Sequence, residues 1–349
     1  MHATSSQVLA SRHVTGQRIA SFMKALGRGV LNVLLIGFIA WASLAIYFSN
    51  LPGHPVRLLL AVAYAAFAIW SIWIVRDRTL IAAFGLVSLG VLIWWSMIPP
   101  SHERTWRPEV AVMPRVEVDA DRVVFTGVRN FDYRTRDDFT VRYETREVQL
   151  SHLTGVDFYI SYWMPGPIGH TFLSFTFDNA PPVSVSIEAR PEAHEGYAPI
   201  ASLFKQFELI YVVGDERDLV RVRTNYRGED VYLYRIDTTP EQARRLFLVY
   251  LQRINELADR AEFYHLLSNS CTVNIVRYAN VAGRQGRMNL RHYLNGLIDA
   301  YLYDTNRLNT GIPFDELRQR SHINAAALAA GDDPAFHERI RAAVPPARH

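Results

Sequence analysis

The 349-residue sequence predicts an α+β protein, with three N-terminal transmembrane helices followed by a domain in which an antiparallel sheet packs on helices. Two observations support this fold class. Three apolar runs without a charged residue fill most of the first hundred positions. Beyond them, segments with strand-like alternation come first and segments with helical spacing follow, an order typical of α+β folds.

The apolar runs cover residues 29–49, 58–75 and 80–98. Each is close to the roughly 20 residues needed to cross about 30 Å of hydrocarbon. A secretory signal peptide is an alternative for the first run, but two more runs follow at once and no small-residue cleavage pattern comes after Ser49. We therefore expect residues 1–28 to form a basic N-terminus and residues 29–99 a three-helix membrane anchor.

Basic residues set the expected orientation. The first 28 residues contain four basic side chains and no acid, the second loop contains Arg76 and Arg78, and the first loop contains only Arg57. Positively charged segments stay in the cytoplasm, so the N-terminus is expected there. The sequence thus predicts a bacterial inner-membrane protein with a periplasmic domain over residues 100–349 and a core at about residues 115–310. No Asp, Glu, Lys, Arg or His lies within the three runs, which favours an anchor over a transporter.

Composition narrows the class of function. The formal net charge is +3, and residues 100–349 carry 30 basic and 33 acidic side chains, so no nucleic-acid partner is indicated. The only cysteine, Cys271, excludes an intramolecular disulfide and a zinc site built from several thiolates. The histidines lack metal-ligand spacing and no glycine-rich phosphate or dinucleotide loop is present, so neither a metal nor a cofactor is expected.

Alternating apolar and polar residues, bounded by turn residues, predict the strands of the second domain. These strands are expected over residues 122–128, 140–148, 156–163, 170–177, 183–189, 208–213 and 231–236. After Pro240 the spacing becomes helical, because proline suits a first helical position and the apolar residues then recur every three to four positions. Helices are expected over residues 240–261, 271–282, 290–303 and 315–320, followed by a tail rich in Ala, Arg and Pro.

Cys271 lies where a helix is expected to begin. Unpaired N–H groups and the helix dipole lower the pKa of a thiol placed there, which favours a nucleophile. The candidate bases are His170, at the start of a predicted strand, and His265; we prefer His170, with Glu188 on the neighbouring strand holding its second ring nitrogen. Each residue also has an ordinary structural explanation: Cys271 as a buried small side chain, His170 as a surface residue at a strand end, and Glu188 as a partner of Arg190.

The order of histidine before cysteine, with the cysteine opening a helix behind Asn269 and Ser270, resembles the permuted papain-like fold of the lecithin:retinol acyltransferase and NlpC-type group. A closer resemblance, which covers most of residues 90–310, is to the Lnb N-terminal periplasmic domain family. The motifs that carry this likeness are Pro100 to Trp106, Val128 to Arg134, His170 to Phe175, Ser186 to Arg190, Tyr211 to Asp218 and Asn269 to Thr272.

The resemblance implies a permuted papain-like domain with lipoprotein N-acyltransferase activity. Such enzymes place an acyl chain on the α-amino group of a lipoprotein's N-terminal cysteine. By this likeness Cys271 is the nucleophile that forms a thioester and His170 is the base, a membrane phospholipid is the acyl donor, and a lipoprotein is the acceptor.

We expect further residues to assist this chemistry. The backbone N–H of Cys271, with the side chain of Asn269, Tyr264 or Tyr162, would stabilise the oxyanion. The basic residues expected either to meet lipid phosphates or to pair with nearby acids are Arg129, Arg134 and Arg190.

Two other functions remain open at this stage. A papain-like cysteine peptidase or amidase acting on cell-wall peptides would use the same three residues and would present an open polar cleft, whereas an acyltransferase would present an apolar channel continuous with the membrane. A noncatalytic, membrane-anchored binding module would use Cys271 only for packing.

Overall fold

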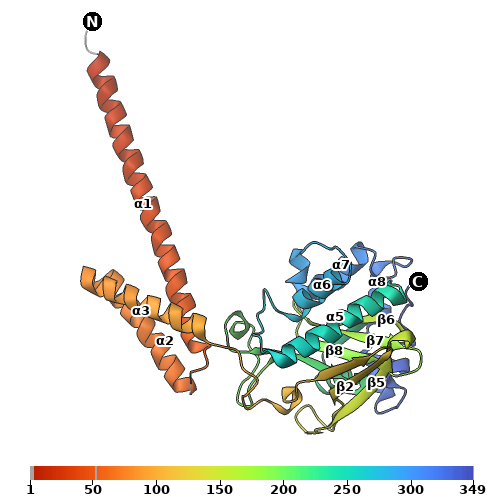
Figure 1. Cartoon of the computed structure of the whole chain (residues 1–349). Helices are drawn as coiled ribbons and strands as arrows, with labels where there is room; N and C mark the ends of the chain where they lie inside the picture. The colour runs from red at the N-terminus through yellow and green to blue at the C-terminus, as the bar shows by residue number, and fades with distance from the viewer. Residues whose placement is uncertain (1–3, 52, 349) are drawn as a thin grey trace. The chain divides into compact units, whose positions relative to one another are not determined.

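The computed structural model describes residues 4–51 and 53–348, and the chain divides into two compact units, Met1–Pro99 and Pro100–His349 (Figure 1). The first unit contains α1 (Thr4–Tyr47), α2 (His54–Ile69), which continues as a π-helical turn η1 (Trp70–Val75), and α3 (Arg78–Met97). Three segments are long and apolar enough to span a membrane, which confirms the predicted apolar helices: Ser21–Tyr47, His54–Val75 and Arg78–Met97.

Local chemistry explains the sharp turn between the second and third helices. Arg76 adopts a left-handed conformation with φ 60°, and Asp77 then caps α3 by accepting hydrogen bonds from the N–H groups of Thr79 and Leu80. Many large apolar side chains of these helices are exposed; Leu86, for example, is 71% exposed. A helix that is apolar on all sides needs lipid or protein around it, which agrees with a membrane location.

The second unit is built on an eight-stranded sheet in the order β1-β2-β9-β8-β7-β6-β10, with β5 also paired to β2. Neighbours are antiparallel except β2 and β9, which meet in parallel at Arg129 and Gly214. The strands are β1 (Arg115–Asp119), β2 (Arg122–Arg129), β5 (Tyr143–Gln149), β6 (Leu153–Tyr162), β7 (His170–Phe177), β8 (Val183–Arg190), β9 (Glu208–Gly214) and β10 (Asp230–Arg235), and β3 (Asp132–Tyr133) with β4 (Phe139–Thr140) forms a separate pair.

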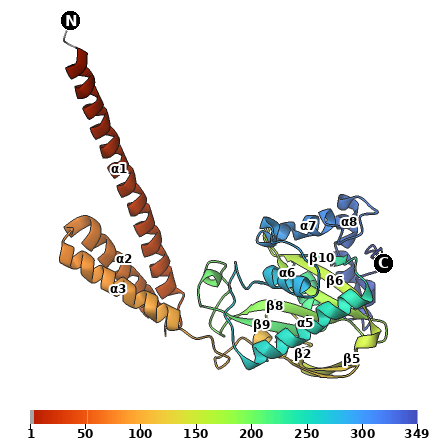
Figure 2. The same ribbon diagram turned by 45° about the horizontal axis from the view of Figure 1, so that its top comes forward.

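Two longer helices cover one face of this sheet (Figure 2). They are α5 (Pro240–Asp259), which begins with a capping box formed by Thr239 and Gln242, and α6 (Cys271–Val281). Apolar residues at three-to-four spacing on α5 point at the sheet, and the ring of Phe247 lies 4.7 Å from that of Phe175 on β7. The α+β class with a mostly antiparallel sheet is therefore confirmed.

The opposite face is covered by short segments. These are α4 (Glu216–Leu219), the π-helical η5 (Val222–Tyr226), α9 (Asn324–Ala330) and α10 (Phe336–Arg339). Phe336 and Ile340 pack with Tyr159 and Phe172 of the sheet in one buried cluster. The expected core at residues 115–310 leaves out this C-terminal segment, which was predicted to be a tail.

The predicted helix over residues 290–303 is interrupted. It consists of two 3-10 turns, η6 (Leu290–His292) and η7 (Asn295–Leu297), followed by α7 (Ile298–Asp304). The break coincides with a tertiary contact, in which the N–H of Gly296 donates to the carbonyl of Pro167 at 2.8 Å. Only glycine allows this approach, because a Cβ atom there would lie 2.5 Å from the backbone carbon of Pro167. The remaining short elements are η2 (Pro108–Val110), η3 (Leu150–His152), η4 (Ala201–Leu203) and α8 (Phe314–Ser321).

Candidate active site

Cys271 is the first residue of α6, directly after its N-cap Ser270, and only 3% of its surface is exposed. Burial alone raises the pKa of a thiol, because the charged form loses hydration. Here a hydrogen bond to His170 and the charge of that ring outweigh burial and lower the pKa of Cys271 to about 6. The thiol is thus predominantly a thiolate at neutral pH.

His170 begins β7 and is held by the next strand. Its Nε2 lies 2.7 Å from the hydroxyl oxygen of Ser186, on β8. Because Nε2 is occupied in this way, Nδ1 is the ring nitrogen left for the thiol of Cys271. The other candidate base, His265, has its Nδ1 3.0 Å from the hydroxyl of Ser268 within the loop that precedes α6.

Glu188 acts on His170 mainly through Ser186. The hydroxyl of Ser186 donates to Oε1 of Glu188 over 2.7 Å, whereas the direct distance between His170 Nε2 and Glu188 Oε1 is 3.6 Å. Arg223 of η5 donates to the same carboxylate oxygen over 2.8 Å. Burial raises the pKa of Glu188, but the charges of Arg223 and His170 outweigh it and hold that pKa far below its usual range. The carboxylate therefore stays ionised and can support an imidazolium.

Polar groups also surround the sulfur itself. The backbone N–H and the hydroxyl of Thr171 bond the thiolate, and the hydroxyl of Thr272 lies 3.8 Å from Sγ and 2.8 Å from that of Thr171. The amide nitrogen of Asn295 is 3.8 Å from Sγ, and the Asn295 side chain pairs with both backbone groups of Gly169 at 2.9 and 2.6 Å. These contacts fix the end of β7 against the start of α6.

The three side chains expected to stabilise an oxyanion have different positions. Tyr264 is buried, and its hydroxyl accepts a hydrogen bond from the backbone N–H of Cys271, so it lies beside the nucleophile. Burial raises the pKa of Tyr264 well above its usual value, which keeps the phenol protonated. Asn269 instead donates to the carbonyl of Phe263 at 2.9 Å, and Tyr162 donates to the carbonyl of Gly296 at 2.7 Å.

The arginines predicted to meet lipid phosphates are occupied within the protein. Arg129 is 3% exposed and forms a two-pronged ion pair with Asp218, at 3.0 and 2.8 Å. Arg190 is 2% exposed, donates to two backbone carbonyls of residues 110–111 and stacks on Trp106. Arg134 is exposed but pairs with Asp138. The lipid-contact interpretation therefore fails for Arg129 and Arg190, because burial removes them from any ligand.

Sequence reasoning did not single out three of the site's residues: Ser186, Arg223 and Asn295. Ser186 carried a detectable signal, since it lies two positions before Glu188 on the same face of one strand. The other two reach the site only through tertiary packing. Among the described residues, no group of three or more His, Cys, Asp or Glu side chains is arranged to hold a metal ion.

A family model matches part of the chain. Residues 139–308, which include Cys271, His170 and Glu188, match the family model described as the Lnb N-terminal periplasmic domain. No curated protein and no solved structure matches the chain. The sequence resemblance to the Lnb family is thus confirmed, whereas the finer relation to permuted papain-like folds stays a prediction.

Proposed function

The chain contains an Lnb N-terminal periplasmic domain over residues 139–308, and from this premise we propose that it is a membrane-anchored thiol acyltransferase. It moves a fatty-acyl chain from a phospholipid, through a thioester on Cys271, to an amine, namely the N-terminal cysteine of a bacterial lipoprotein. The anchor lies in the inner membrane with its N-terminus in the cytoplasm. The observation that carries this proposal is the contact between His170 and Cys271, which lowers the pKa of the thiol to about 6 in a chain that also has three helices able to span a membrane.

The first half of the reaction forms the acyl-enzyme. The Cys271 thiolate attacks the ester carbonyl of the phospholipid, and the carbonyl oxygen becomes an oxyanion beside the protonated Tyr264 hydroxyl, which can donate to it while the Cys271 N–H holds that hydroxyl in place. The tetrahedral intermediate collapses by breaking the ester C–O bond, and His170 gives its proton to the departing lysophospholipid oxygen. A thioester on Cys271 and a neutral His170 remain.

The second half transfers the acyl group. The acceptor amine attacks the thioester carbonyl while neutral His170 takes a proton from its nitrogen. Breaking the C–S bond then releases the amide and restores the Cys271 thiolate beside a protonated His170. The Ser186–Glu188 pair stabilises that imidazolium in both halves, since Glu188 is ionised and bonded to the same hydroxyl.

Surface chemistry near the site supports a lipid substrate over a peptide. In the loop that leads into His170, Trp163 is 42% exposed and Met164 is 57% exposed. Residues 163–169 of this loop contain no charged side chain. Leu267, four positions before the nucleophile, is 52% exposed. Exposed aromatic and aliphatic side chains suit contact with a bilayer surface, whereas a peptidase would present a polar groove to its substrate.

The proposal is tested by intact mass spectrometry of the full-length protein after incubation with phospholipid and no acceptor. We expect a fatty-acyl mass increment that hydroxylamine removes. Cys271→Ala should lack it, and His265→Ala, which changes the histidine outside the pair, should retain it. Adding a diacylglyceryl peptide with a free N-terminal cysteine should discharge the acyl group, and the N-acetylated peptide should not. No adduct on a folded wild-type protein would refute the proposal.

A further inference from the structure

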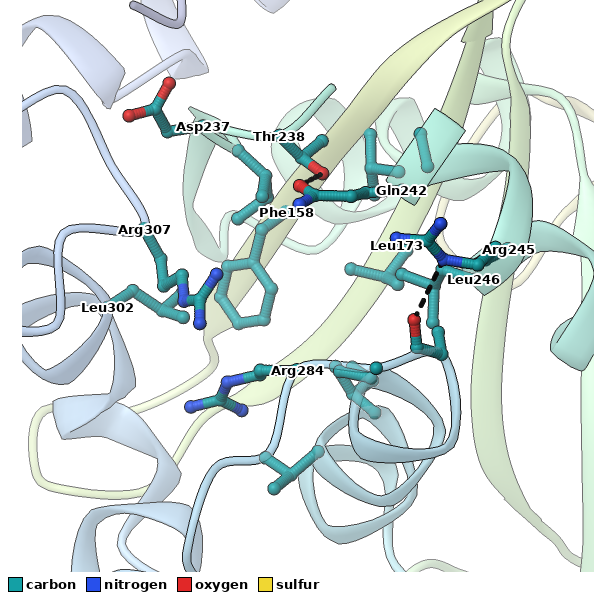
Figure 3. A pocket seen from close by; sticks show the side chains of 18 of the residues that line it. Phe158, Leu173, Asp237, Thr238, Gln242, Arg245, Leu246, Arg284, Leu302 and Arg307 are labelled. Atoms are coloured by element: carbon teal, nitrogen blue, oxygen red, sulfur yellow. Dashed lines mark hydrogen bonds between the residues drawn. The ribbon is translucent and has the colours of Figure 1, made fainter. Parts of the chain in front are cut away.

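A cavity of about 270 Å³ lies behind the nucleophile helix, between α5, α6, α7 and strands β6 and β7 (Figure 3). Its floor is apolar and buried, formed by Val156, Phe158 and Leu173. The face of α6 that carries Thr272, Val276 and Ala279 forms one wall. Thr272 neighbours Cys271, but Cys271 itself does not line the cavity.

The rim of this cavity has cations that lack counter-ions. Figure 3 shows the guanidinium groups of Arg284 and Arg307 on the same side of the cavity, near the ring of Phe158. Arg284 is partly buried, and among the described residues its guanidinium donates to the hydroxyl of Tyr301 alone, at 2.9 Å. Within the described part of the chain, Arg284 has no carboxylate partner and the Arg307 side chain has no hydrogen-bond or ion-pair partner.

Without an anion beside them, the two neighbouring cations Arg284 and Arg307 are electrostatically unfavourable. Burial lowers the pKa of Arg284, and repulsion from Arg307 lowers it further. The other charges at the rim are already balanced: Asp237 pairs with Arg348 at 2.6 Å, and Arg245 pairs with Glu241 at 3.3 Å. An anionic group between Arg284 and Arg307 would supply the missing counter-charge, because partly buried cations need a charged partner.

We propose that this cavity binds a single-chain anionic amphiphile, with its tail in the apolar cavity and its carboxylate or phosphate between Arg284 and Arg307. Ligand pockets usually enclose about 300–1,000 Å³, so a volume near the lower limit suits one chain and not two. The charged rim holds the head group of the ligand at the mouth of the cavity, and the tail then extends toward Thr272. An ester reacting at Cys271 needs its carbonyl at the sulfur, so this ligand occupies a second site, distinct from that of the acyl donor.

The head group has two chemical sources, the carboxylate of a free fatty acid and the phosphate of a lysophospholipid, and photolabelling distinguishes them. The probe is dodecanoic acid with a diazirine near its tail, added to full-length Cys271→Ala protein in phosphatidylcholine nanodiscs. We expect crosslinks to map to residues 272–283 of α6 and its end, and to residues 298–302. Unlabelled dodecanoate and lysophosphatidylglycerol are then compared as competitors, and the stronger one identifies the source.

Three variants and a neutral competitor make the test decisive. Arg284→Gln with Arg307→Gln should reduce labelling roughly tenfold, and Ala279→Trp should abolish it by filling the cavity. Arg291→Gln, which changes an arginine that is already paired with Asp304, should leave labelling unchanged. Equal labelling in the double variant, equal competition by dodecanol, or crosslinks outside the cavity would overturn the proposal.

A folding control completes the design. Each variant is also made with Cys271 present, and an unchanged rate of thiol alkylation at pH 7 shows that α6 and His170 remain in place. Because the binding assay uses protein without the nucleophile, its result does not depend on acyl transfer. A negative result in the binding assay therefore leaves the proposed enzymatic function untouched. A negative result in the acyl-transfer assay likewise leaves the proposed second site untouched.

Discussion

The hydroxyl of Ser186 connects the ring of His170 with the carboxylate of Glu188 in the candidate site. This hydroxyl lies 2.7 Å from both His170 and Glu188, which are themselves 3.6 Å apart. We predict that Ser186→Ala lowers the acylation rate of Cys271 by roughly 10- to 150-fold, the equivalent of one charge-assisted hydrogen bond of about 1.5–3 kcal/mol. Rates of adduct formation from phospholipid, followed by intact mass, measure the effect.

The neighbouring Ser184 supplies a matched control for that prediction. It lies on the same face of β8 and is equally buried, but it bonds Ser174 at 2.6 Å, away from the histidine. Ser184→Ala should keep the wild-type rate, and Ser186→Thr, which retains a hydroxyl, should recover most of it. If both serine-to-alanine variants lose activity equally, the hydrogen bonds of Ser186 to His170 and Glu188 are not the cause of the loss.

The charge state of Cys271 depends on His170. The pKa of this thiol is lowered to about 6, so alkylation by iodoacetamide should rise as the pH passes upward through about 6 and level off above it. In His170→Ala only burial and the threonine contacts remain, so we predict a midpoint at about 8.5 or above, that of an ordinary thiol. Alkylation rates measured from pH 4.5 to 9.5 test this. His265→Ala should keep the wild-type midpoint, and a shift there would transfer the role of base to His265.

At the level of elements, a buried ion pair fixes the end of β2 to α4. Arg129 and Asp218 are both nearly inaccessible, and Asp218 also accepts from the backbone N–H of Phe131 at 2.8 Å. Removing one partner leaves a buried charge uncompensated, which costs about 3–5 kcal/mol. We therefore predict that Arg129→Ala lowers the melting temperature by roughly 10 °C, as measured by thermal unfolding of the full-length protein.

The control for this prediction is another arginine of the same motif. Arg134 is exposed and pairs with Asp138 four residues away, so Arg134→Ala should leave the melting temperature nearly unchanged. A small shift for Arg129→Ala would mean that water or a rearranged acid compensates Asp218. The two variants thus separate a structural arginine from a surface arginine.

Elements with strong local signals were predictable from the sequence. The strand from His170 to Phe177 matches its predicted bounds, and α6 begins at the predicted residue, since alternation and the polar segment before Cys271 are local features. The helix expected over residues 290–303 was wrong in detail, because its break comes from the approach of Gly296 to Pro167, more than a hundred residues away. Arg223 and Asn295 were missed for the same reason.

At the level of the whole molecule, the division into an apolar unit and a sheet-based unit follows from composition alone. The three apolar runs, and the absence of charged residues within them, were readable without tertiary information. The contribution of residues 323–344 to the core was not, because their alanine-rich pattern is weak until Phe336 and Ile340 meet Tyr159 and Phe172. Local sequence patterns therefore predicted the two units, whereas the C-terminal extent of the second unit depends on tertiary packing.

The orientation of the anchor links the whole molecule to its proposed function. Lipoprotein amines and the outer leaflet can meet Cys271 only if the second unit is periplasmic, which requires the loop at Asn50 outside and the start of α3, at Thr79, inside. We predict that, in a Cys271→Ala background, an impermeant maleimide labels Asn50→Cys in cells with a permeabilised outer membrane. Thr79→Cys, equally exposed on its helix, should be labelled only after lysis. The reverse pattern would place the thiol in the cytoplasm, away from mature lipoproteins, and would leave the acyl-transfer proposal without its acceptor.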